Sequence, residues 1–165
     1  IKAIYSSDLQ RTRKSAQIIG KEHGLDPIVY PELRELSFGT WEGMSVSAVE
    51  SAYPGQIKER MQSVATFQAD GGETYPQLQA RVVPKYEEIV ARHTDDQIAM
   101  VCHGGVNRVI LSHILGIPLD RIFRIHQDYA ALNIIQYYDK EPVVEYIGNA
   151  ELFSSQKDEI KTAIQ

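Results

Sequence analysis

The sequence of 165 residues has little cysteine, no long apolar run and no excess of basic side chains. Its single cysteine, Cys102, excludes a disulfide within the chain and is typical of a protein of the reducing cytoplasm. No stretch reaches the ~18 consecutive apolar residues of a membrane-spanning helix. Lys and Arg number 17 against 22 Asp and Glu, and the net charge of -5 argues against a nucleic-acid partner. We therefore expect a cytoplasmic protein with neither a membrane nor a nucleic acid as partner.

Residues 1–165 are expected to form a single domain, because 43% hydrophobic residues are enough for one sizeable core and no linker is present. Strand-like segments at 1–5, 27–30 and 97–102 alternate with helical patterns. The first helix is expected to start at a capping box formed by Ser7 and Gln10. Strands alternating with helices predict an α/β fold, a three-layer α/β/α arrangement around a mostly parallel sheet.

The remaining segments carry helix and hairpin signals. Thr74 and Gln77 repeat the capping-box spacing and open a helical pattern in which Pro84 is expected to introduce a kink. Further elements expected are a structured loop at 31–43, helices over 45–69 interrupted near Pro54-Gly55, a helix at 105–115, an antiparallel hairpin of 132–138 with 143–147, and a loosely held terminal helix at 154–165.

Three residues at or after predicted strand ends could carry chemistry. Arg11 lies in the first turn of a helix, Glu35 lies in a loop, and His103 ends a strand just before a glycine pair. Ligands of open α/β sheets bind at this edge, where helix N-termini attract anions. An Arg that grips phosphate oxygens, a His that contacts them and a carboxylic acid that protonates a leaving oxygen suit phosphoryl transfer.

Plainer interpretations compete with this one. Arg11 could be a solvated side chain and Glu35 an ordinary loop charge. A nucleophilic pair of Cys102 and His103 is disfavoured, because adjacent strand residues point to opposite faces. No Cys/His spacing indicates zinc and no phosphate-binding loop is present, so we expect no metal and no cofactor.

Four segments, in order, resemble motifs of the histidine phosphatase superfamily, the branch that includes cofactor-dependent phosphoglycerate mutase. The resemblance extends to about residue 148. It implies that Arg11 binds the phosphoryl group, Glu35 protonates the leaving group and His103 stabilises the transferring oxygens, with Ser7 and Gly104 as substrate contacts. Thr12, Ser15 and Ala130-Ala131 are mild departures from the family pattern. The four segments are SSDLQRTRKSA, LRELSFGTWEG, GGETYPQLQARV and VCHGGVNR.

One departure is larger. The family opens with a strand that ends in Arg-His-Gly, whose histidine is the nucleophile, and these 165 residues contain no such motif. That strand is central to the family's sheet, so without it two edges would lack partners. We expect the sequence to be the downstream part of a complete enzyme, with the leading segment cleaved, supplied by another chain or omitted.

The short loop after Glu35 is more similar to the small phosphatases of the family than to its mutases. The resemblance therefore implies a metal-independent phosphatase that hydrolyses a small phosphomonoester through a phosphohistidine, with α-ribazole phosphate as one candidate substrate. The alternatives are mutase-type phosphoryl transfer, or an inactive relative that binds phosphorylated ligands. Residues 44–75 are expected to select the substrate, and a homodimer is left open.

Overall fold

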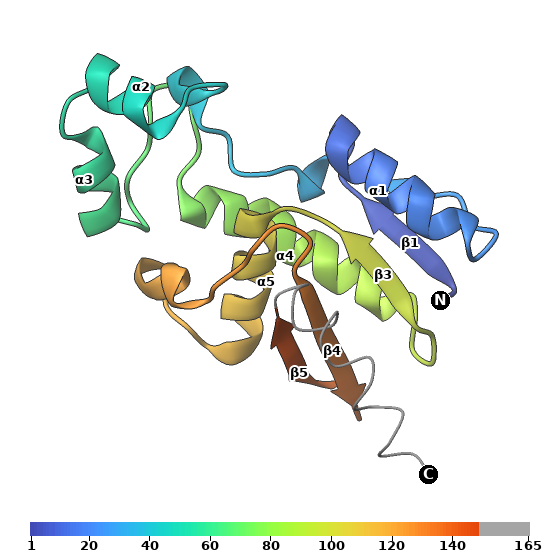
Figure 1. The fold of residues 1–165 in the computed structure, drawn as a ribbon. Coiled ribbons are helices and arrows are strands. Elements are labelled where there is room, and N and C mark those ends of the chain that lie inside the picture. Colours follow the sequence, from blue (N-terminus) through green and yellow to red (C-terminus); the bar gives the residue numbers. More distant parts are fainter. Residues whose placement is uncertain (149–165) are drawn as a thin grey trace, which may run out of the picture.

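The computed structural model describes residues 1–148, and its core is a three-stranded parallel sheet in the order β2-β1-β3 (Figure 1). Strand β1 is central and each of its residues is buried. The elements are β1 Ala3–Ser6, α1 Gln10–Lys21, β2 Ile28–Val29, α2 Val46–Ala52, α3 Gln56–Gln62, α4 Tyr75–Ala91, β3 Ile98–Val101, α5 Gly104–Leu115, β4 Leu132–Tyr138 and β5 Glu141–Gly148, with 3-10 turns η1 Pro31–Leu33, η2 Gly39–Trp41 and η3 Leu119–Arg124.

The two faces of β1 pack against different helices. Ile4 faces α1, where Gly20 comes so close that an added Cβ would lie 3.5 Å from the Ile4 Cδ1 atom and 2.3 Å from a backbone oxygen. Tyr5 faces the other side and shares a buried cluster with Ile89 of α4. Alternate strand residues point to opposite faces, so one short apolar strand serves both helical layers. The three-layer α/β/α prediction is confirmed.

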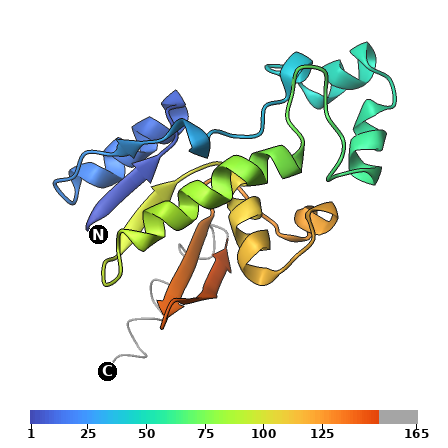
Figure 2. The ribbon, with the colours of Figure 1, turned by 180° about the vertical axis from the view of Figure 1, so that it is seen from behind.

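The C-terminal hairpin forms a separate sheet (Figures 1 and 2). Strands β4 and β5 pair antiparallel, as predicted, around a turn in which Asp139 and Lys140 have positive φ. Ile135 and Tyr137 pack on the main core, whereas Ile134 is 42% exposed. Within residues 1–148, β3 has β1 as its only strand partner, so the hairpin does not continue the parallel sheet.

Two sequence-based helix starts had different outcomes. The capping box of Thr74 and Gln77 is present, and α4 continues through Pro84. The capping box expected at Ser7 and Gln10 is wrong, because α1 starts at Gln10 after Leu9 and no side chain caps it. The Ser7 hydroxyl lies within hydrogen-bond distance of His103, just after β3, and of Thr12 in α1 instead. The predicted terminal helix at 154–165 lies outside the described residues.

Helices α2 and α3 lie over the loop that follows β2, away from the sheet (Figure 1). The predicted interruption is confirmed, since Gly55 precedes α3 with φ of 85°. Trp41, Val49 and Ala69 are buried together and attach this segment to the loop. Among the described residues, no helix combines the length and apolar character needed to cross a membrane.

Candidate active site

The carboxyl ends of β1 and β3 bring two distant segments into contact. The last paired residues are Ser6 and Val101. Just beyond them, the Ser7 hydroxyl lies 2.8 Å from Nε2 of His103 and 2.6 Å from the Thr12 hydroxyl. All three side chains are buried. Ser7 therefore holds the imidazole ring in place from the neighbouring strand.

His103 lies in a positive environment at the start of a helix. It is the residue before α5, and α1 starts beside it at the end of the adjacent strand. Burial lowers the pKa of His103 from 6.5 to about 4, and the charges of Arg11 and Arg81 act in the same direction. The N-termini of two 12-residue helices also favour negative charge. An anion such as a phosphoryl group would be stabilised here.

Glu35 reaches the same helix terminus from the loop after β2. Its Oε2 atom accepts a 3.0 Å hydrogen bond from the backbone N–H of Gly105, and its Oε1 atom accepts one of 2.9 Å from that of Leu36. A Cβ on Gly105 would lie 2.3 Å from Oε1. Glycine is thus required at this position for the carboxyl group to lie against the helix. The structure brings Glu35 and His103 to one helix terminus, where Arg11 also acts.

Arg81 positions the loop that carries Glu35, a role that the sequence did not reveal. Its guanidinium donates to the backbone oxygens of Glu32, Arg34 and Glu35 at 2.7, 2.8 and 3.0 Å. It also pairs with Glu73 at 2.7 and 2.8 Å. Arg81 and Glu73 both lie in the segment GGETYPQLQARV, and this was the available signal. The backbone oxygens that Arg81 contacts, however, lie more than forty positions upstream along the chain.

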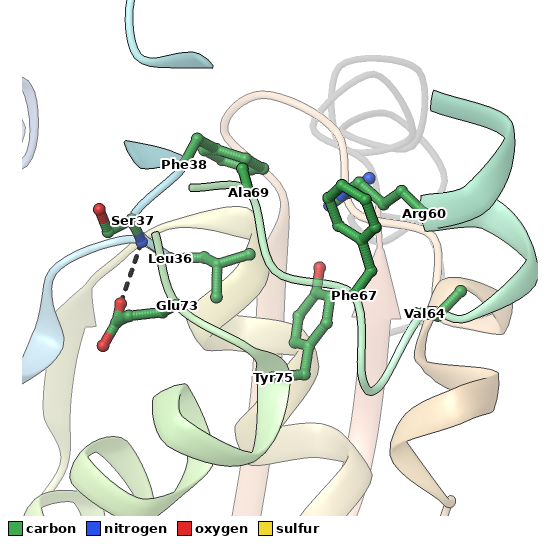
Figure 3. A pocket seen from close by; sticks show the side chains of 9 residues that line it. All are labelled: Leu36, Ser37, Phe38, Arg60, Val64, Phe67, Ala69, Glu73 and Tyr75. Atoms are coloured by element: carbon green, nitrogen blue, oxygen red, sulfur yellow. Dashed lines mark hydrogen bonds between the residues drawn. The ribbon is translucent and has the colours of Figure 1, made fainter. Parts of the chain in front are cut away.

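Glu73 adds a further contact between this segment and the loop that carries Glu35 (Figure 3). Its Oε2 atom accepts a 3.0 Å hydrogen bond from the backbone N–H of Ser37. The hydrogen bond from Arg81 lowers the pKa of Glu73, with a smaller contribution in the same direction from the Ser37 N–H. A bidentate pair of Arg34 and Asp8, at 2.5 and 2.6 Å, links the same loop to the residue after Ser7. The loop is therefore fixed on both sides of Glu35.

Cys102 and Gly104 flank His103 in the chain and have different properties. Burial raises the pKa of the Cys102 thiol to about 12, and the Glu35 charge adds to the effect, so the thiol is not a ready nucleophile. Gly104 forms the first turn of α5, and a Cβ there would lie 3.1 Å from Nη1 of Arg108. No group of three or more His, Cys, Asp or Glu side chains that could hold a metal ion is found within residues 1–148.

Together, the fold and the site define an α/β protein with a candidate anion-binding site at the carboxyl edge of a parallel sheet. The sequence pattern of the histidine phosphatase superfamily (branch 1) matches residues 1–150. This chain belongs to that superfamily.

Its relatives include named phosphatases. The chain is 28% identical over 141 residues to phosphoserine phosphatase 1 of Hydrogenobacter thermophilus, covering 86% of this chain and 67% of that protein. It is 31% identical over 124 residues to a glucosyl-3-phosphoglycerate phosphatase of Mycolicibacterium vanbaalenii, covering 71% and 55%. The chain thus spans about two thirds of one relative and about half of the other. The structure of the α-ribazole phosphatase from Shigella flexneri superposes with a TM-score of 0.78 at 18% identity over 89% of this chain and 73% of that one, a likeness of fold alone.

Proposed function

We propose that this protein is a phosphatase that hydrolyses a small phosphomonoester through a phosphohistidine intermediate. The observation that carries the proposal is the convergence of Glu35, through its bond to Gly105, and His103 on the N-terminus of α5. Arg11 also lies near His103, because its charge adds to burial in lowering the pKa of His103. The named phosphatases among its relatives support this assignment.

The reaction has two steps. A nucleophilic histidine attacks phosphorus, and the bond from phosphorus to the leaving oxygen breaks as Glu35 gives that oxygen a proton. Water then attacks the phosphohistidine, releases phosphate and returns a proton to Glu35. Each Glu35 oxygen accepts one backbone hydrogen bond, so a lone pair remains to carry the proton. Arg11, His103 and the backbone of Gly104 stabilise charge on the phosphoryl oxygens.

The nucleophile comes, in this proposal, from a segment outside the 165 residues that pairs with the edge of β3 for which residues 1–148 supply no strand. Every residue of β3 is partly exposed, although its sequence is Ile-Ala-Met-Val, whereas every residue of β1 is buried. An apolar strand with an unpaired edge is a template for another strand. A histidine at the end of such a strand would lie beside His103, since parallel strands end at one edge of a sheet.

The proposed function also bears on the substrate, the cellular location and the partners. The substrate is small and phosphorylated, and α-ribazole phosphate remains a candidate. A lone cysteine and a net charge of -5 support a cytoplasmic location without a nucleic-acid partner. A homodimer is compatible with this function and is not required by it.

The test is hydrolysis of p-nitrophenyl phosphate in EDTA, with the intact mass recorded from the same sample and the phosphorylated residue trapped by rapid quench. We expect turnover in EDTA and a phosphorylated histidine other than His103 whenever the nucleophile segment is present, and none from a sample of 18.6 kDa. Turnover at 18.6 kDa would contradict the external nucleophile. Absence of turnover with that segment present would overturn the phosphatase itself.

A further inference from the structure

Three buried side chains, from α1 and from the residues just after β1 and β3, form one chain of hydrogen bonds. The Thr12 hydroxyl lies 2.6 Å from the Ser7 hydroxyl, which in turn lies 2.8 Å from Nε2 of His103. The exposed fractions of Thr12, Ser7 and His103 are 4%, 0% and 6%. Each of these contacts needs one proton, so the direction of one hydrogen bond determines the direction of the next.

Thr12 has further acceptors that decide where its own proton lies. Its hydroxyl is 2.9 Å from the backbone oxygen of Leu9 and 3.3 Å from that of Ser7, and neither oxygen can donate. A threonine in a helix commonly donates to the carbonyl three or four positions earlier. With its proton on Leu9, Thr12 accepts from the Ser7 hydroxyl at 2.6 Å. The opposite direction would leave two oxygen atoms 2.9 Å apart with no proton between them.

The Ser7 hydroxyl is then fully used as a donor and can only accept from His103. Its single proton lies toward Thr12, and its oxygen also accepts a 3.3 Å hydrogen bond from the backbone N–H of Leu9. Nε2 of His103 therefore carries a proton, which it donates to Ser7 at 2.8 Å. A neutral imidazole has one N–H group, so its other nitrogen, Nδ1, is left without a proton.

Nδ1 is also the ring atom that remains for a ligand. Nε2 is the ring nitrogen that bonds within residues 1–148, and in the proposed function His103 contacts phosphoryl oxygens. An anionic oxygen accepts hydrogen bonds and cannot donate one, so it is repelled by an unprotonated Nδ1. The ring must gain a proton at Nδ1, and the imidazolium then donates both to Ser7 and to the anion.

The surroundings of the ring keep it neutral until an anion binds. Burial lowers the pKa of His103 to about 4, and the charges of Arg11 and Arg81 act in the same direction. Both oxygens of Glu35 are already bonded to backbone N–H groups. A bound oxyanion would offset the two arginine charges and raise the pKa of His103. The charged and titratable groups at this edge of the sheet are Asp8 after β1, Arg11 of α1, Glu35 after β2, Arg81 of α4 and Cys102 after β3.

Resting on the proposed function, we infer that Thr12 is a positioning residue that couples anion binding to the uptake of a proton. Through Ser7 it fixes the neutral ring of His103 as the Nε2–H form, so an oxyanion binds at Nδ1 together with one proton taken from solvent. The coupling belongs to this chain, because Thr12 is a departure from the family pattern. Without the Thr12 hydroxyl, Ser7 would donate to Nε2, and the neutral ring would offer an Nδ1–H group to the anion.

Nitrogen NMR of the histidine ring tests the assignment of the proton. In the ligand-free protein near neutral pH, we expect an unprotonated Nδ1 and a protonated Nε2 in His103. Thr12→Val keeps the shape of the side chain and removes the hydroxyl, so the two nitrogen types should exchange. Ser15→Ala, which removes another α1 hydroxyl that donates to a backbone oxygen, is the control and should leave the ring unchanged. A protonated Nδ1 in the unaltered protein overturns the inference, whether or not the variants fold.

Calorimetry with inorganic sulfate tests the coupling, since sulfate stays a dianion in this pH range and brings no proton. The free ring is neutral above about pH 4 and the bound ring is protonated, so the complex holds one proton more and the affinity falls as pH rises. Titrations in buffers of different ionisation enthalpy should count about one proton per sulfate near pH 6. The affinity should fall by close to tenfold per pH unit, at about pH 5 to 7.

Thr12→Val should take up clearly less proton with sulfate and show a shallower fall in affinity. Any other group that gains a proton contributes equally to both proteins, so the difference reports on His103. Ser7→Ala breaks the connection, and in that background Thr12→Val should change proton uptake no further. Equal uptake in the unaltered protein and Thr12→Val, or no sulfate binding over this range, would overturn the coupling. Neither measurement needs turnover, so hydrolysis of p-nitrophenyl phosphate tests the proposed function separately.

Discussion

His103 combines burial with a hydrogen bond to Ser7 from a segment almost a hundred positions away. Residue types and their places after strands indicated Arg11, Glu35 and His103 as candidate site residues, and the structure brings the latter two to one helix terminus. The contribution of Arg81 could not be predicted in this way. Arg81 acts on backbone oxygens far along the chain, and no local spacing encodes such contacts.

The lowered pKa of His103 predicts a loss of stability in acid. The folded chain keeps this ring neutral down to about pH 4, whereas the unfolded chain takes up its proton near pH 6.5. The unfolded state thus binds more protons between these values, so this contribution to the free energy of unfolding is present above pH 6.5 and lost as pH falls to 4. Urea unfolding from pH 4 to 7 measures it.

The matched variant is His103→Gln, which keeps a polar nitrogen for Ser7 but does not titrate. We expect its stability to fall less steeply over this range than that of the unaltered protein. The exposed His23→Gln is the control and should leave the slope unchanged. Identical slopes for the unaltered protein and His103→Gln would show that His103 is not the group responsible.

Elements with strong local signals were predicted well. The parallel strands, the hairpin and the capping box of α4 follow from alternation, turn residues and side-chain spacing. The start of α1 was not predicted, because Ser7 has the local signature of a cap but its hydroxyl binds His103 and Thr12. A long-range contact therefore overrides a local preference at the point where the site is built.

The turn from β3 into α5 predicts a specific effect of Gly105→Ala. The new Cβ would meet the Glu35 carboxyl at about 2.3 Å, so the acid must move away from the leaving oxygen. We expect hydrolysis of alkyl phosphates to fall by roughly 10²-fold, within the range for loss of a general acid. p-Nitrophenyl phosphate, whose leaving group needs little protonation, should be affected much less. Steady-state rates on both substrates measure the difference.

A double-mutant cycle separates displacement of Glu35 from general damage to the helix. Glu35→Ala removes the atoms that the new Cβ would strike, so Gly105→Ala should cost little more in that background. Additive losses of the two changes would instead mean that Gly105→Ala acts on the fold.

At the scale of the whole molecule, the described strands form two separate sheets. Strand β1 has a partner on each side, whereas β3 has one and the β4–β5 hairpin pairs only with itself. We therefore predict faster hydrogen exchange at Ile98–Val101 than at Ala3–Ser6, since part of the β3 backbone has no ladder partner in the described part of the chain. Exchange followed by mass spectrometry on the 165-residue chain measures this. Protection of β3 as strong as that of β1 would show that its second edge is already covered.

The hydrogen bond between Ser7 and His103 also serves as a check on strand alignment. It joins the residue after Ser6 to the second residue after Val101, just beyond the last matched pair of β1 and β3. A slip of one position would move His103 about 3.3 Å along the strand direction relative to Ser7 and break this hydrogen bond. Correct alignment and ligand affinity therefore arise together, and inorganic phosphate added during refolding would favour the properly aligned chains over the rest. Ligand binding would in this way select the chains in which the binding site is correctly assembled.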